Sequence, residues 1–102
     1  VPLTPRGSAS AGYGGAVPAA GGIVVDMYRM RGLVSVDTEA GTATALPATT
    51  LQDIDEALRA QGFRMPLMPT SAPSATIGGL WARAVPASAA PLRAPWPTIS
   101  CR

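Results

Sequence analysis

Residues 5–18 read PRGSASAGYGGAVP, and this stretch decides how the rest of the chain is interpreted. Small residues dominate it, so the backbone can approach a ligand without side chains in the way. Successive N–H groups in such a loop form a concavity that binds anions such as phosphate. A flexible linker is the alternative, but a linker would be more polar and would not contain Tyr13, Val17 and Pro18.

A second loop of small residues, TSAPSATIGG, occupies residues 70–79 and is expected to run into a helix that starts near Ser74 or Ala75. Both loops carry hydroxyl groups, and a helix start adds free N–H groups, so the two together suit a pyrophosphate held without lysine. The standard motifs are absent, because the chain has neither G-x-G-x-x-G between a strand and a helix nor G-x-x-x-x-G-K-[ST]. From composition alone, ordinary turns are the favoured interpretation of both loops.

Strands are predicted between the two loops. Residues 1–4 are interpreted as the end of a strand, and residues 23–27, IVVDM, as a buried strand because they are β-branched and apolar. Residues 33–37 and 42–46 are expected to form a β-hairpin. Its turn ends in Gly41, at the position that needs a positive φ.

One helix is predicted over residues 50–61, with Thr50 as its N-cap and Gly62 as its terminator. Its apolar face is expected to cover a sheet made of residues 23–27 and the hairpin. The residues of this face are Leu51, Ile54 and Leu58. The acids at 53, 55 and 56 are interpreted as capping groups and a solvated face rather than an acid–base pair. A short extended piece is expected at 63–67.

Composition excludes several classes of site and partner. The chain has no His or Lys, and its eight Arg residues are scattered, so it lacks the basic stripe typical of nucleic-acid binding. The single cysteine, Cys101, allows neither an intramolecular disulfide nor a Cys/His metal site, and the acids show no metal-loop spacing. No segment is long and apolar enough to span a membrane, and no signal peptide is recognised, so a cytoplasmic location is expected.

The loop PRGSASAGYGGAVP resembles the pyrophosphate loop of the FAD-linked oxidases, the family of D-lactate dehydrogenases, glycolate oxidases and vanillyl-alcohol oxidase. The family form is close to P-R-G-G-G-T-S, two variable positions and G-G-A-V-P; here Ser8 and Ala9 replace glycines. GGIVVDMYRM is similar to the family's strand G-G-I-V-L-D-L-S-R-M, and TSAPSATIGG to its second flavin-contacting loop. The hairpin and helix follow at the family's spacing, so the resemblance covers residues 2–80.

The resemblance implies an α+β fold, a fragment of the two-subdomain FAD-binding fold, with residues 1–81 as a partial FAD-binding domain. It implies that backbone amides of residues 7–11 and the Ser10 side chain contact the FAD pyrophosphate, while residues of the second loop line the other side of the cofactor. The residues expected to contact FAD are Arg6, Gly7, Ser8, Ala9, Ser10, Ala11, Thr70, Ser71, Ser74, Ala75, Thr76 and Gly79. Many members attach the flavin covalently through His; this chain has no His, so its FAD is expected to be non-covalent.

The implied function is the FAD-binding portion of an oxidoreductase whose parent oxidises a 2-hydroxy acid or an alcohol. The substrate-orienting residues belong to the remainder of the enzyme, so no catalytic residue and no metal site are expected here, and the chain alone is not expected to turn over. Two alternatives stay open. One is a truncated or frameshifted remnant with little or no FAD binding, and the other is a small non-enzymatic binding module.

Residues 82–102, ARAVPASAAPLRAPWPTISCR, depart from the family, which continues with stretches like A-x-G-G-A-G-I-G-S and G-P-L-A-D-N-I-V. Reading each third codon base with the next two permits Gly-Gly-Ala-Gly-Ile-Gly-Ser over residues 83–90, and Gly-Pro-Leu-Ala-Asp-Asn-Ile-Val over 93–101. The Ala of the second stretch is forced, because Trp96 followed by Pro97 can only be TGG-CC.

We therefore predict that the tail is translated out of frame, lacks regular structure beyond the first helical turns and leaves Trp96 poorly buried. A genuine divergent tail is the alternative. The coding DNA decides between them, because a shifted frame that does not encode the glycine-rich stretch would refute the prediction.

Overall fold

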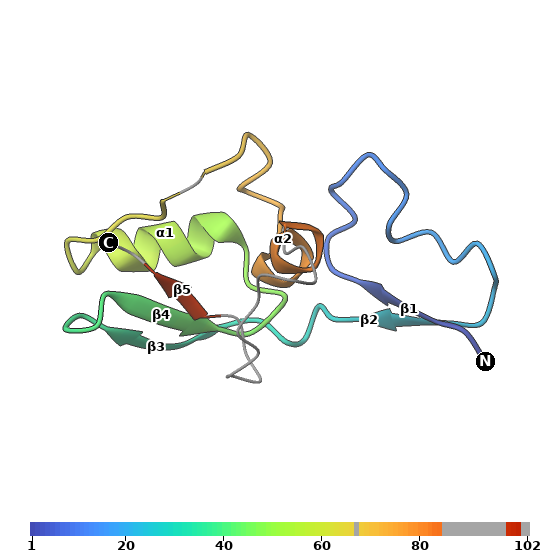
Figure 1. The fold of residues 1–102 in the computed structure, drawn as a ribbon, viewed down its shortest axis with the longest axis horizontal. Coiled ribbons are helices and arrows are strands. Elements are labelled where there is room, and N and C mark those ends of the chain that lie inside the picture. Colours follow the sequence, from blue (N-terminus) through green and yellow to red (C-terminus); the bar gives the residue numbers. More distant parts are fainter. Residues whose placement is uncertain (67, 85–97, 101–102) are drawn as a thin grey trace.

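The computed structural model describes residues 1–66, 68–84 and 98–100. Strands and helices are mixed, which agrees with the expected α+β class. Figure 1 shows α1 lying against β3, β4 and β5 at one end, the β1–β2 pair at the other end, and α2 between them. The elements in chain order are β1 (Leu3–Arg6), β2 (Ile23–Asp26), β3 (Leu33–Asp37), β4 (Thr42–Ala45), α1 (Leu51–Arg59), α2 (Ile77–Ala84) and β5 (Thr98–Ser100).

The predicted helix forms as α1 and ends two residues earlier than expected. The Thr50 side chain accepts a hydrogen bond from the Asp53 backbone N–H at 3.2 Å, which satisfies one of the free donors of the first turn. After the helix, Gly62 takes a φ of 82°, a conformation that favours glycine. The local capping signals therefore fix both ends of this element.

The apolar face of α1 forms the core. Leu51, Ile54 and Leu58 are all 0% exposed, as predicted, and pack with Ala43 and Ala45 of β4. The rest of the cluster comes from the segments after the helix, namely Met65, Ala72 and Ile77. The small residues of β4 let the helix approach the sheet closely, and the core joins α1 to the start of α2.

The predicted hairpin forms from β3 and β4, which pair antiparallel with Asp37 opposite Thr42. Gly41 takes a φ of 65°, as the turn requires. The Asp37 side chain accepts hydrogen bonds at 3.0 Å from the backbone N–H groups of Glu39 and Ala40, which holds the turn. This element was predicted correctly because its signals are all local.

Strand β5 corrects one expectation about the tail. Residues 98–100 pair antiparallel with β4, so the prediction that the tail lacks regular structure beyond the first helical turns is wrong for these residues. The expected exposure of Trp96 lies outside the described residues. Helix α2 continues to Ala84, in agreement with the first helical turns that were expected at the start of the tail.

Strand β2 forms where it was predicted, but not in the expected sheet. It pairs in parallel with β1 in a separate two-stranded sheet, whereas β3, β4 and β5 make the other sheet. It is also not buried, since Ile23, Val24 and Val25 are 54%, 43% and 40% exposed. Its apolar composition is typical of parallel strands covered on both faces, and the described residues supply no such cover.

Two further expectations about local structure are wrong. Residues 63–66 form no strand, and α2 begins at Ile77 rather than near Ser74 or Ala75. The reason is the hydrogen bonding of the loop, because Ser71 O accepts from the backbone N–H groups of Ser74 and Ala75 at 2.9 and 2.7 Å. These turns end before the helix starts.

The second loop is fastened to the start of α1. The Leu51 N–H donates to Ala75 O at 3.0 Å, and the Ile77 N–H donates to Thr49 O at 2.9 Å. One step later, the Gly78 N–H donates to Pro47 O at 2.8 Å, and a Cβ on Gly78 would lie 2.8 Å from the Pro47 Cβ. Only glycine allows this approach, so Gly78 fixes how α2 meets the segment after β4.

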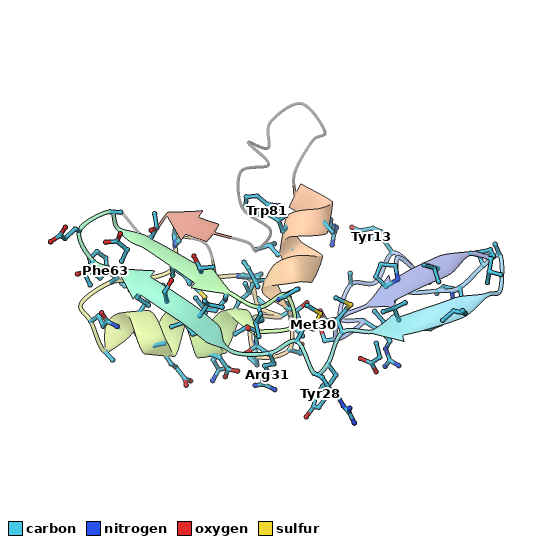
Figure 2. The ribbon with its side chains drawn as sticks, turned by 90° about the horizontal axis from the view of Figure 1, so that it is seen from below. Tyr13, Tyr28, Met30, Arg31, Phe63 and Trp81 are labelled. Carbon is cyan, nitrogen blue, oxygen red and sulfur yellow. The ribbon has the colours of Figure 1, made fainter. Side chains whose placement is uncertain are left out.

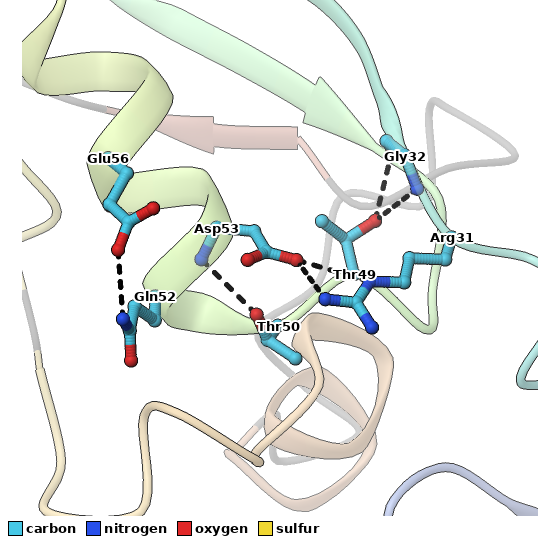
Figure 3. Close-up of polar contacts among 7 residues, drawn as sticks. All are labelled: Arg31, Gly32, Thr49, Thr50, Gln52, Asp53 and Glu56. Carbon is cyan, nitrogen blue, oxygen red and sulfur yellow. Dashed lines mark hydrogen bonds and ion pairs between the residues drawn. The ribbon is translucent and has the colours of Figure 1, made fainter.

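A polar cluster ties the segment after β2 to the same helix start (Figure 3). The Thr49 hydroxyl donates to Gly32 O at 3.0 Å and accepts from the Gly32 N–H at 2.9 Å. Beside it the Arg31 guanidinium pairs with the Asp53 carboxylate, which lowers the pKa of that carboxyl. Both partners of the pair are partly exposed, so it contributes little to stability.

Asp55 is not on a solvated face, contrary to the sequence interpretation. It is 4% exposed and accepts hydrogen bonds from the Met65 backbone N–H at 2.9 Å and from Arg59 Nε at 2.6 Å. The Met65 hydrogen bond and then the Arg59 guanidinium outweigh the effect of burial and lower the carboxyl pKa below its ordinary value of 3.8. Asp55 therefore holds the chain after α1 against the helix.

We expect Leu58→Ala to lower the free energy of unfolding by roughly 2–5 kcal/mol, because it opens a cavity in the core. Val34→Ala is the control, because Val34 lies in β3 of the sheet that α1 covers and is 55% exposed. Urea unfolding followed by circular dichroism measures both. Equal losses in the two variants would show that α1 does not pack as described.

We expect Asp55→Asn to lower the free energy of unfolding at pH 7 by about 1–3 kcal/mol, because a charged acceptor is lost. A carboxyl whose pKa is lower in the folded state stabilises the fold above its unfolded pKa, and that stability is lost as pH falls through the folded pKa. Stability of the unsubstituted chain should thus fall below about pH 4, and less steeply in Asp55→Asn. Asp53→Asn removes the carboxylate of the exposed pair with Arg31, and it should lower the free energy of unfolding at pH 7 by less than Asp55→Asn does. A larger loss in Asp53→Asn would contradict the structural role assigned to Asp55.

Candidate cofactor site

The two loops of small residues lie side by side, as the sequence predicted. A Cβ placed on Gly7 would lie 2.6 Å from Thr76 Oγ1, so the backbone of the first loop touches the side chain that starts α2. Between the loops is a cleft with a volume of about 780 Å³. It is large enough for a sizeable ligand, since small-molecule pockets have volumes of roughly 300–1,000 Å³.

Most of the residues expected to contact a cofactor line this cleft. They are Gly7, Ser8, Ala9, Ser10 and Ala11 from the first loop, and Ser71, Ala75, Thr76 and Gly79 from the second. Ser74 lines a smaller neighbouring pocket of about 210 Å³, which shares Gly7, Ser8 and Thr76 with the cleft. Arg6 and Thr70 line neither cavity. The role of each residue toward a cofactor stays a prediction.

The first loop presents its backbone to the cleft. Within the described chain, the backbone N–H groups of residues 8–11 donate no hydrogen bond. Ala9 takes a φ of 53°, a left-handed conformation that costs an alanine roughly 1–2 kcal/mol. This is a position where the family pattern has glycine. The loop thus keeps its glycine-like shape despite the substitution, and its free N–H groups remain available to an anion.

The second loop is held by its own hydrogen bonds. Thr76 Oγ1 accepts from the Gly79 backbone N–H at 3.3 Å, and Thr76 O accepts from the Leu80 N–H at 3.0 Å. A Cβ on Gly79 would lie only 3.2 Å from the same Oγ1. The start of α2 is therefore compact, and its small residues leave the cleft open.

Several residues that line the cleft were not expected from the sequence, and two of them carry polar side chains. Tyr13 comes from the first loop, and Arg83 comes from the last turn of α2. Arg83 Cζ lies 4.4 Å from the centroid of the Tyr13 ring. A signal for Arg83 was available, because it follows Gly79 by four residues and a helix places such positions on one face.

The electrostatics of the cleft favour an anion. Among the described residues that line it, none is acidic and Arg83 is the one charged side chain. Hydroxyl groups of Ser8, Ser10 and Ser71 add hydrogen-bond donors. Free N–H groups, hydroxyls and a cation fit a ligand that carries phosphate groups.

The described residues hold no group of three or more His, Cys, Asp or Glu that could bind a metal ion. Among the helices in the described part of the chain, none has the length and apolar character needed to cross a membrane.

Comparison with known proteins gives a family for this arrangement. The sequence pattern of the family described as FAD binding domain matches residues 1–92. The chain is 37% identical over 79 residues to the glycolate oxidase subunit GlcD of Bacillus subtilis. It is 35% identical, over the same length, to an uncharacterized FAD-linked oxidoreductase of Mycobacterium tuberculosis. Each alignment covers 78% of this chain and 17% of the relative.

A solved structure agrees with the sequence relatives. An alkyldihydroxyacetonephosphate synthase superposes with a TM-score of 0.69 at 27% identity, covering 78% of this chain and 16% of that one. The chain thus spans about a sixth of the length of the proteins it matches. The chain belongs to the FAD-binding domain family of the FAD-linked oxidoreductases, and FAD is the cofactor of that family.

Proposed function

We propose that this chain supplies the part of an FAD-linked oxidoreductase that holds the diphosphate of FAD. The observation that carries the proposal is the contact of Gly7 with Thr76, which joins the two loops around a cleft free of acidic residues. The backbone N–H groups of residues 8–11 would bind phosphate oxygens, and Ser10 would add its hydroxyl. Their exposure within the cleft, without other partners in the described chain, supports this role.

The reaction of the whole enzyme is part of the proposal. One relative is named as a glycolate oxidase subunit, so we propose that the parent enzyme oxidises a 2-hydroxy acid or an alcohol. FAD supplies the redox chemistry when bound, as the acceptor of two electrons. The residues of this chain bind and orient it, and none is assigned a catalytic role. The chain has no His, which supports non-covalent binding.

The partners of this chain are proposed on the same basis. Because the chain spans 17% of its curated relatives, we propose that the rest of the FAD domain and a substrate domain complete the enzyme. A cytoplasmic location stays a prediction from the sequence.

A second candidate function is a remnant with little or no FAD binding. The observation that favours it is the exposure of β2, whose apolar residues Ile23, Val24 and Val25 lack cover in the described chain. Such a sheet is only marginally stable by itself. The first candidate predicts weak FAD binding by the isolated chain, because surfaces that would bury the flavin ring are missing, and the second predicts little or none. Tight, stoichiometric retention of FAD would contradict both expectations.

We expect Gly7→Ala to weaken FAD binding about tenfold or more, because the new Cβ forces Thr76 away and separates the two loops. Gly12→Ala is the matched control, since a Cβ there meets nothing within 4 Å. Quenching of flavin fluorescence during titration measures both. If Gly7→Ala binds FAD as well as Gly12→Ala does, the cofactor lies elsewhere.

A further inference from the structure

We infer that Arg83 is the cation that this cleft offers to the diphosphate of FAD, and that Tyr13 holds it in position at the mouth. The inference rests on the proposed function and names a residue that was not among those expected to contact FAD. Both side chains line the cleft, and both are exposed, so the pair lies where the cleft opens to solvent. Figure 2 shows Tyr13 beside α2, the helix that carries Arg83.

The charge of Arg83 is available to a ligand. Arg31 and Arg59 form ion pairs with Asp53 and Asp55. Arg83 forms no ion pair within the described chain, and its Cζ lies over the Tyr13 ring. No acidic side chain among the described lining residues neutralises it. An anion that enters therefore meets one uncompensated positive charge.

The position of Arg83 over the Tyr13 ring suits phosphate recognition. The attraction between a guanidinium and a ring face is electrostatic and uses none of the oxygen acceptors that its N–H groups could bind. Those donors match the geometry of phosphate oxygens, which arginine binds through two parallel hydrogen bonds. The contact with Tyr13 thus restrains the side chain without using the groups that would bind the diphosphate.

The position of Arg83 on α2 supports the same role. Thr76 lies against Gly7 of the first loop, and Gly79 lines the same cleft. Arg83 follows Gly79 by one turn on the same helix face. The helix therefore carries the cation along the wall opposite residues 8–11. Arg83 lies beyond the motifs of residues 2–80 that carry the resemblance, so this contribution does not follow from those motifs.

The test compares Arg83→Gln with Arg64→Gln, which removes the same charge from an exposed residue outside the cleft. FAD and inorganic diphosphate are titrated against each folded variant, because diphosphate presents the phosphate groups without the flavin ring. We expect Arg83→Gln to weaken the binding of both ligands about tenfold. Arg64→Gln should behave as the unsubstituted chain, and Arg83→Lys should retain part of the FAD affinity, since lysine keeps the charge without the planar fork.

Two further measurements separate binding from a structural role. Raising the salt concentration should weaken FAD binding less in Arg83→Gln than in the unsubstituted chain, because one phosphate contact is gone. Tyr13→Phe, which keeps the ring, should bind FAD normally, and Tyr13→Ala should lose less affinity than Arg83→Gln.

The outcomes distinguish this inference from the proposed function. Unchanged FAD affinity in Arg83→Gln overturns the inference and leaves the function standing. A loss of FAD affinity with unchanged affinity for inorganic diphosphate assigns Arg83 a structural role and also overturns it. An unsubstituted chain that binds no FAD overturns the cofactor site together with the inference.

Discussion

The approach of Gly7 to Thr76 is the constraint on which the rest of the structure depends. Thr76 forms an isolated β-bridge with Thr50, the N-cap of α1, and its Oγ1 accepts the hydrogen bond that starts α2. The same Oγ1 faces Gly7 at the end of β1, at a distance that leaves no room for a Cβ. Thr76 therefore contacts the start of each helix and the first loop. These contacts fix the position of the cleft.

Local signals allowed much of the fold to be predicted. Thr50, Gly41 and Gly62 act on their immediate neighbours, and each behaves in the structure as its residue type predicts. The buried face of α1 was predicted for the same reason, because helical periodicity is a property of the sequence alone. The adjacency of the two loops had a different origin. Composition favoured ordinary turns, and the resemblance to a known family supplied the relation between segments about sixty residues apart.

The failures have a physical reason in common, which is that they depend on distant partners. The composition of β2 indicates that it needs cover, but not which strand it pairs with or whether cover is present, and it pairs with β1 while remaining exposed. Asp55 looked like a solvated acid because the sequence gives no sign that the Met65 N–H reaches it. Tyr13 and Arg83 were missed in the cleft because a loop tip and a helix end meet only in space.

The contact between the first loop and the start of α2, here called the joint, couples ligand binding to structure through its composition. Gly7, Thr76 and Gly79 bring little apolar area to the contact between the two parts of the chain, whereas the α1 core is built from large aliphatic side chains. A ligand that binds residues 8–11 and the start of α2 together supplies contacts that the joint lacks. Anything that binds the folded state alone stabilises it, so occupation of the cleft would order the two loops as well as depend on them. The small residues leave space for a cofactor but contribute little contact area themselves. A bound cofactor would therefore stabilise this part of the fold most.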